Sequence, residues 1–175
     1  MKHTNLKSTT KLAAVLAIAV FEAHAQESGR PTQIDERRRI VVSIPKRKLV
    51  LLEGERVLRI YDVAVGKSST PTPEGRFSIL NRVPNPTYYG HRMVVAPGAD
   101  NPLGSRWMGL SVKGYGIHGT NVPSSIGKAA SHGCVRMGKR DLEELFEMVT
   151  VGTTVELQGE ATELIAKILA DSVTE

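Results

Sequence analysis

Cysteine is almost absent from this sequence, in which Cys134 is the only one among 175 residues. A single cysteine cannot form a disulfide within the chain, and without a C-x-x-C pair or a second, resolving cysteine thiol–disulfide exchange is disfavoured. Aromatic residues are also scarce, at 5% of the chain, which leaves few rings on which nucleic-acid bases could stack. We therefore expect neither an internal disulfide nor a nucleic-acid partner.

Long hydrophobic runs are equally rare, and the run Leu12–Phe21 is too short to span a bilayer, which takes roughly 20 apolar residues. Three lysines precede this run, and small residues follow it at Ala23 and Ala25. This pattern is typical of a secretory signal peptide over residues 1–25 and predicts a periplasmic or cell-envelope protein. An uncleaved membrane anchor, or a buried helix, is the alternative.

The rest of the chain has the composition of one globular domain, with 41% hydrophobic and 23% charged residues overall. We expect a flexible arm over residues 26–38, a single domain over 39–158 and a tail over 159–175. The basic stretches around residues 36–48 either form a solvated face or attract an anionic envelope polymer. We expect about 150 residues after cleavage, which suit one domain with a single core and no separate second module.

Short β-rich segments separated by glycine and proline predict a mainly β fold, either a sandwich or a barrel. The clearest is a hairpin over 48–65 that turns at Glu53-Gly54-Glu55. Further strands are expected at 39–44, 76–80, 91–98, 105–112, 114–119 and 151–157. Apolar residues at helical spacing predict one packed helix over 141–149, after the cysteine. The tail forms either a short amphipathic helix or a frayed end.

Residues 85–105 are rich in proline and glycine and predict a long loop. Loops of this length in a compact domain are usually functional or disordered, so we expect a loop that covers a substrate. Its Tyr88 and Tyr89 contact sugar or peptide in this interpretation, and are simply exposed in the alternative one.

The stretch SHGCVRM, residues 131–137, places a glycine directly before the only thiol. A nucleophilic cysteine needs a base and donors for the oxyanion, and the N–H groups of Gly133 and Cys134 are candidate donors. Either His118 or His132 can serve as the base. A lone cysteine is also often a small buried residue. A zinc site from His118, His132 and Cys134 is a third possibility, although their spacing matches no known zinc motif.

The segments IHGT, SIG and SHGCVRM together resemble the signature of the L,D-transpeptidase catalytic domain of bacterial cell-wall enzymes. The resemblance extends over about residues 40–157 and implies a β-sandwich or barrel with a packed helix. It also implies that Cys134 is the nucleophile and His118 the base, oriented by the carbonyl of Gly119. His132 would help to hold substrate, and the N–H groups of residues 132–134 would form the oxyanion hole. No Asp or Glu lies within ten residues of His118, which fits an orienting carbonyl.

The implied reaction starts at a peptidoglycan tetrapeptide stem, releases D-alanine and leaves a thioester on the cysteine. The acyl group then passes to an amine on a second stem or a lipoprotein. The resemblance implies no metal or cofactor, a role in cell-wall biogenesis and cell shape, and reaction with carbapenems. Water as acceptor would make the protein an L,D-carboxypeptidase, and loss of catalysis would leave a peptidoglycan-binding protein of the same fold.

Three further residues are weaker candidates for substrate binding. Arg136 stands where many members have asparagine and would bind a stem carboxylate through a bidentate fork, or else form a structural salt bridge. Trp107 lines an acceptor cleft or belongs to the core or rim. Ser131 hydrogen-bonds a histidine or caps a turn.

Overall fold

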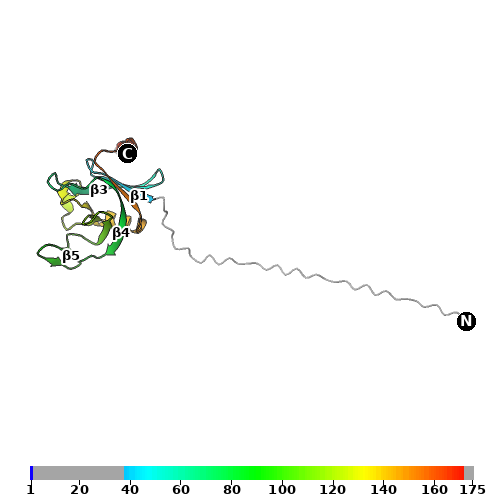
Figure 1. The fold of residues 1–175 in the computed structure, drawn as a ribbon, viewed down its shortest axis with the longest axis horizontal. Helices are drawn as coiled ribbons and strands as arrows, with labels where there is room; N and C mark the ends of the chain where they lie inside the picture. Colours follow the sequence, from blue (N-terminus) through cyan, green and yellow to red (C-terminus); the bar gives the residue numbers. More distant parts are fainter. Residues whose placement is uncertain (2–37, 172–175) are drawn as a thin grey trace. The chain divides into compact units, whose positions relative to one another are not determined.

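The computed structural model describes Met1 and residues 38–171 (Figure 1). The rest of the predicted signal peptide, the predicted arm up to residue 37 and the last four residues lie outside this part of the chain. Within residues 38–171, no helix is both long and apolar enough to cross a bilayer.

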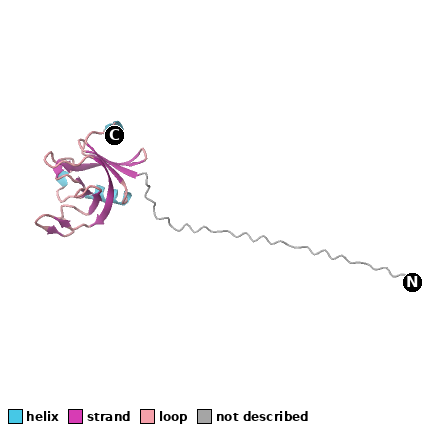
Figure 2. Cartoon of the chain, in the orientation of Figure 1, coloured by secondary structure: helices cyan, strands magenta, loops and turns pink. Residues whose placement is uncertain are grey.

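Strands dominate the described residues, and two α-helices and one short 3₁₀ turn accompany them (Figure 2). The strands are β1 Arg38–Ser43, β2 Lys48–Glu53, β3 Arg56–Gly66, β4 Gly75–Pro84, β5 Tyr88–Tyr89, β6 Val94–Val95, β7 Arg106–Leu110, β8 Gly116–His118, β9 Ala129–Ser131, β10 Val135–Met137 and β11 Thr154–Gln158. The helices are α1 Lys139–Met148 and α2 Glu163–Asp171, and the 3₁₀ turn is η1 Pro123–Ser125.

Nine of these strands form one sheet that closes on itself. Their order is β10-β8-β7-β4-β11-β1-β2-β3-β9, and β10 also pairs with β3. The second pairing joins the first strand of the order, β10, to the last but one, β3, so the sheet closes into a barrel, which removes most of its free edges. The expected mainly β fold with a helix after the cysteine is therefore confirmed.

Strands β1 and β2 are buried on both faces, which explains their continuous apolar runs. One face, with Ile40 and Leu51, belongs to the main core, into which α1 also inserts Leu142. The opposite face, with Val41 and Val50, packs against α2 through Ile165 and Leu169. The part of the tail that the structure describes therefore forms a helix, which covers this second face.

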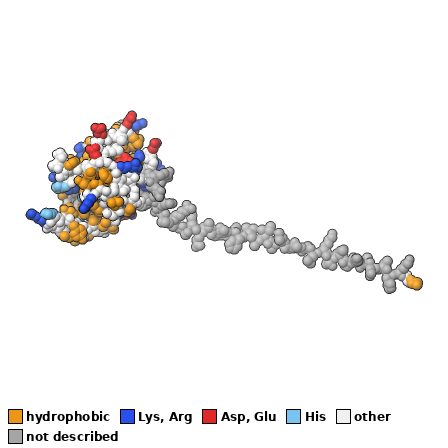
Figure 3. Space-filling view, in the orientation of Figure 1, with side chains coloured by type: hydrophobic (Ala, Val, Ile, Leu, Met, Phe, Trp, Pro, Cys, Tyr) orange, Lys and Arg blue, Asp and Glu red, His pale blue; other side chains and the backbone are white. Residues whose placement is uncertain are grey.

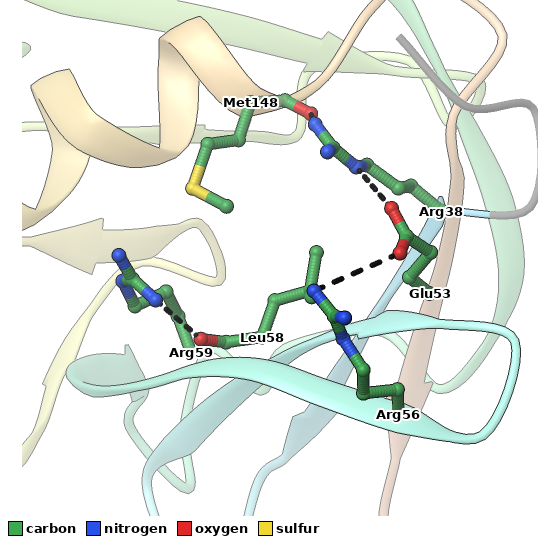
Figure 4. Close-up of polar contacts among 6 residues, drawn as sticks. All are labelled: Arg38, Glu53, Arg56, Leu58, Arg59 and Met148. Carbon is green, nitrogen blue, oxygen red and sulfur yellow. Dashed lines mark hydrogen bonds and ion pairs between the residues drawn. The ribbon is translucent and has the colours of Figure 1, made fainter.

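The last turn of α1 contains no basic residue of its own. An arginine from another element, Arg38, contacts the C-terminal end of this helix instead. Arg38 at the start of β1 donates from Nη1 to the carbonyl oxygen of Met148 at 2.8 Å and from Nε to Glu53 Oε1 at 3.3 Å (Figure 4). A cation at this end suits the negative end of the helix dipole. Arg56 of β3 lies 3.9 Å from the same carboxylate, so β1, β2, β3 and α1 meet at one polar junction.

Two predicted features need correction. Residues 85–105 are mostly loop, yet they contain a small hairpin, because β5 pairs with β6 outside the main sheet. The strand expected over 91–98 is reduced to the two residues of β6. Strands β9 and β10 on either side of Cys134 were not predicted, because three residues each are too few to show a periodicity.

Candidate active site

The predicted site residues gather around one pocket of about 830 Å³. It lies between the ends of β7, β8 and β10 and the 85–105 segment. Its lining comprises Val83, Asn85, Pro86, Thr87, Tyr88, Tyr89, Pro102, Leu103, Trp107, Gly114, His118, Ser131, His132, Cys134 and Arg136. Eight of the ten predicted residues are in this lining, and the other two, Gly119 and Gly133, are next to lining residues in the chain.

Cys134 lies in the tight turn between β9 and β10. Gly133 has a φ of 113°, a conformation that residues with a side chain rarely adopt. A Cβ at this position would also come within 2.5 Å of the ring of Tyr115. Only glycine therefore fits directly before the thiol.

Ser131 holds this turn together. It is fully buried, and its Oγ accepts from the N–H of Gly133 at 3.0 Å and donates to the carbonyl oxygen of Cys134 at 2.5 Å. Of the two roles considered for Ser131, these contacts support the capping of a turn. Because the N–H of Gly133 donates to Ser131, the N–H of Cys134 is the candidate oxyanion donor without this contact.

His118 ends strand β8 and is buried, with 5% of its surface exposed. Its Nδ1 lies 2.7 Å from the carbonyl oxygen of Gly119, as the sequence analysis expected. Because a carbonyl oxygen only accepts, Nδ1 carries the proton and Nε2 keeps a free lone pair. The pKa of His118 is lowered to about 4, chiefly by burial and also by the charge of Arg136. The hydrogen bond to Gly119 acts in the opposite direction and raises the pKa by less. The ring is therefore neutral at pH 7 and able to accept a proton.

Strand register places the histidine beside the cysteine turn. β8 and β10 run parallel, and His118 stands opposite Arg136, two residues after Cys134. On the other side of β8, His118 stands opposite Trp107 of β7. The two rings are stacked, with centroids 5.6 Å apart and an angle of 27° between their planes. Trp107 thus forms one side of the histidine's surroundings, a contact that the sequence did not indicate.

The thiol of Cys134 is half-buried and protonated at rest. Burial raises its pKa, while the backbone of Gly116 and the charge of Arg136 lower it by less. The Sγ atom lies 3.7 Å from the carbonyl oxygen of Gly114, to which the thiol donates. Because the cysteine and the histidine are both neutral, attack by sulfur requires a proton to move to the ring as the new bond forms.

Gly114 and Gly116 were missed by the sequence analysis. The signal for them was present, since the GYG triplet directly precedes the IHG of the histidine strand.

Arg136 lines the pocket with an unsatisfied guanidinium. Its Nε is buried and has no hydrogen-bond partner, and among the described residues no carboxylate lies within ion-pair distance of it. The structural salt bridge considered above is therefore not formed with residues 38–171. An anionic group that entered the pocket would find a cation already partly stripped of water.

The remaining predicted residues lie at the rim. His132 is exposed beside the cysteine turn, and Tyr88 and Tyr89 line the pocket from β5, with Tyr89 the more exposed at 78%. Around this hairpin, Figure 3 shows hydrophobic side chains at the surface. Within residues 38–171, no group of three or more His, Cys, Asp or Glu side chains is arranged to hold a metal ion.

Comparison with known proteins agrees with this arrangement. Residues 37–157 match the sequence model of the YkuD family, described as the L,D-transpeptidase catalytic domain. The relative named YkuD in Bacillus licheniformis is 48% identical over 119 residues, which cover 68% of this chain and 64% of that protein. The match thus spans slightly less than two thirds of that relative's own length.

Solved structures share the fold. The avibactam carbamoyl enzyme of Ldtfm has a TM-score of 0.61 and 29% identity, covering 71% of this chain and 50% of that one. A mutant of the Enterococcus faecium L,D-transpeptidase has a TM-score of 0.60 and 26% identity, covering 70% and 50%. The family model matches well over half of the length of this chain, which therefore belongs to the YkuD family of L,D-transpeptidase catalytic domains.

Proposed function

We propose that this protein is a cysteine L,D-transpeptidase that acts on peptidoglycan stem peptides. One observation carries the proposal: a half-buried thiol shares a pocket with a neutral imidazole whose Nδ1 is held by a backbone carbonyl. This leaves Nε2 as the proton acceptor beside the only sulfur nucleophile of the chain. Family membership supports the same chemistry.

In the proposed first step, the Sγ of Cys134 attacks the carbonyl carbon that precedes the terminal D-alanine, and Nε2 of His118 takes the thiol proton. The N–H of Cys134 donates to the oxyanion. The carbon–nitrogen bond then breaks, and the imidazolium returns the proton to the leaving amine, so that D-alanine departs and a thioester remains.

In the second step an acceptor amine attacks the thioester carbon and His118 takes the amine proton. The carbon–sulfur bond then breaks, the new amide is released, and the imidazolium returns the proton to the sulfur of Cys134. The acceptor amine belongs to a second stem, giving a 3→3 cross-link, or to a lipoprotein. Arg136 is the residue best suited to bind a stem carboxylate, because its guanidinium has no partner of its own among the described residues.

Product analysis tests this proposal directly. Purified protein is incubated with tetrapeptide muropeptides, and the products are separated and weighed by mass spectrometry. We expect free D-alanine and cross-linked dimers, neither of which should form with Cys134→Ala. Tripeptide without dimers would instead identify an L,D-carboxypeptidase. Binding to muropeptides without any product would identify a non-catalytic binding protein.

Reaction with avibactam is a second test, because one structural relative is described as an avibactam carbamoyl enzyme. We expect a single adduct on the intact protein, located on Cys134 by peptide mapping and absent from Cys134→Ser. The same measurement can use a carbapenem.

Export is also part of the proposal. The intact mass of the protein recovered from a cell envelope should lack residues 1–25. A full-length mass in the membrane fraction would favour the uncleaved anchor.

A further inference from the structure

One polar side chain, Asn101, is fully buried within the 85–105 segment. Its Nδ2 donates to three backbone carbonyl oxygens, those of Pro86 at 2.8 Å, Val95 at 3.1 Å and Ala96 at 3.2 Å. Its Oδ1 accepts from the N–H of Leu103 at 2.8 Å. Every polar atom of the side chain is therefore used on the backbone, and the hydrogen bonds converge from three separate points of the segment.

Two further hydrogen bonds connect this network to the candidate base. The carbonyl oxygen of Leu103, whose N–H is held by Asn101, accepts from the N–H of Gly119 at 2.7 Å. The carbonyl oxygen of Gly119 in turn accepts from Nδ1 of His118 at 2.7 Å. The carbonyl of Gly119 therefore holds the His118 ring, and the N–H of Gly119 is itself held by Leu103 of the 85–105 segment.

Close packing makes this connection stiff. Gly104 and Gly119 touch, and a Cβ built on either would lie only 2.8 or 2.9 Å from the Cα of the other. Gly104 also has a φ of 64°. A shift of the 100–104 segment would thus be passed directly to Gly119, because there is no space between them to absorb it.

The same side chain also holds the pocket wall. Pro86 lies two residues before β5 of the hairpin that carries Tyr88 and Tyr89, and Val95 ends that hairpin. Asn101 binds both ends, and the hairpin strands β5 and β6 pair only with each other. Asn101 is thus hydrogen-bonded to the backbone on both sides of the hairpin. It also lies two residues before Leu103, whose carbonyl accepts from the N–H of Gly119.

We infer that Asn101 is a positioning residue that couples the placement of the 85–105 wall to the orientation of the His118 ring. This inference rests on the proposed function, in which His118 is the base. Its removal should lower the rate of acylation of correctly folded enzyme, because a small misplacement of a reacting group can cost about 10²-fold in rate. A role in folding alone would lower stability and leave the reaction of the folded molecules unchanged.

The test compares Asn101→Ala with Asn121→Ala as a matched control. Asn121 is exposed, and its Nδ2 donates to the carbonyl oxygen of Asp100 at 3.0 Å, so this control removes a hydrogen bond to the same segment outside the path to His118. Two quantities are measured on the folded protein. One is the first-order rate of avibactam adduct formation at saturation, and the other is the ¹⁵N spectrum of the histidine ring nitrogens.

We expect Asn101→Ala to slow adduct formation by roughly 10- to 100-fold and to shift the Nδ1 and Nε2 signals of His118. Asn121→Ala should retain the wild-type rate within about twofold and leave the ring signals unchanged. A folded Asn101→Ala protein with the wild-type rate and wild-type ring signals would overturn the inference.

A measurement on the wild type covers the case in which Asn101→Ala does not fold. If the network acts as one unit, the Gly119 N–H, the Leu103 N–H and the Asn101 side-chain amide exchange with solvent at one opening free energy. A Gly119 N–H that stays protected after the Asn101 amide has exchanged would overturn the coupling. If wild-type protein formed no adduct and no product, the proposed function would fail, while the ring signals would still decide the positioning role.

Discussion

The two walls of the pocket are held in place by different means. The wall with His118, Cys134 and Arg136 is built on β8 and β10, which are bonded to neighbours on both sides within the closed barrel. The opposite wall, residues 85–105, is largely exposed, and its two strands pair only with each other. The thiol and the imidazole are therefore placed by sheet register, whereas the 85–105 wall depends on a few side-chain hydrogen bonds.

This difference between the two walls bears on which residues should affect the reaction and which should affect binding. A barrel strand cannot shift by one residue without turning its side chains to the other face, so the positions of thiol and imidazole are strongly determined. Exposed positions of the loop wall, whose side chains do not hold its backbone, can vary in sequence at much smaller cost. Substitutions of Cys134 and His118 should therefore affect the reaction directly. Substitution of Asn101 should affect the reaction through His118, whereas substitutions of Arg136 should affect binding.

The largest expected effect comes from Cys134→Ala. It should reduce D-alanine release by at least about 10⁴-fold, because the chain has no other thiol to form the thioester. The assay is single-turnover release of D-alanine from a tetrapeptide muropeptide. Thermal unfolding of the variant should match the wild type, since the side chain removed is small and half-buried. Full activity in the variant would place the chemistry on some other group.

The pH dependence of acylation tests whether the strand wall sets the chemistry through His118. Since burial lowers the pKa of His118 to about 4, the neutral ring persists well below the usual value near 6.5. The rate of adduct formation should therefore stay nearly constant from pH 7 to pH 5 and fall only as the pH approaches 4. His118→Gln should lose roughly 10²- to 10⁴-fold in rate and show no such acid limb.

Stability should change with the same group. Between pH 6.5 and pH 4 the unfolded histidine binds a proton and the folded one resists it, so the free energy of unfolding falls as the pH is lowered. The difference amounts to about 3 kcal/mol for this residue. Denaturant unfolding of wild type and His118→Gln at pH 7 and pH 4.5 measures it. Equal pH slopes for both proteins would show that the ring titrates normally.

An intermediate effect is expected from Arg136→Gln. Losing a charge-assisted hydrogen bond of about 1.5–3 kcal/mol corresponds to a decrease of roughly 10- to 100-fold in kcat/KM. The decrease should appear with stems that carry free carboxylates and vanish with stems whose carboxylates are amidated. Adduct formation at saturating avibactam serves as the control for an intact thiol and base. An equal loss on both kinds of stem would assign Arg136 to structure rather than to recognition.

The smallest effect belongs to an ion pair outside the pocket, in which Arg59 of β3 contacts Glu144 of α1 at 2.6 Å. The Arg59 guanidinium lowers the pKa of Glu144, yet both side chains are substantially exposed. A double-mutant cycle with Arg59→Ala and Glu144→Ala should give only a small coupling in the unfolding free energy, because solvent screens an exposed pair. Turnover should not change, because neither residue touches the pocket.

Local patterns predicted the elements that depend on local physics. The β2–β3 hairpin turns at Gly54, which takes a φ of 61°, and α1 shows the expected helical spacing of apolar residues. The short strands β9 and β10 could not be predicted this way, because each exists only through pairing with a distant strand. α2 is also decided at long range, by the uncovered apolar face of β1 and β2.

The candidate site divides in the same manner. The motif around Cys134 pointed to the pocket residues, and the structure brings them together. The N–H of Gly133 was assigned to the oxyanion although Ser131 takes it, since that hydrogen bond depends on the geometry of the turn. Asn101 gave no signal, because a polar residue in a loop rich in proline and glycine looks exposed until the loop folds around it.

The sequence by itself determined which reactive groups this protein has: one thiol, two nearby histidines and no carboxylate between them. Only the tertiary structure decided that His118 is the buried ring held by a carbonyl, that His132 is at the rim, and that Arg136 has no partner among the described residues. The reason is physical. Burial has the largest effect on the protonation of His118, and this burial comes from strands that are distant in the sequence, although the carbonyl that holds Nδ1 belongs to the next residue, Gly119.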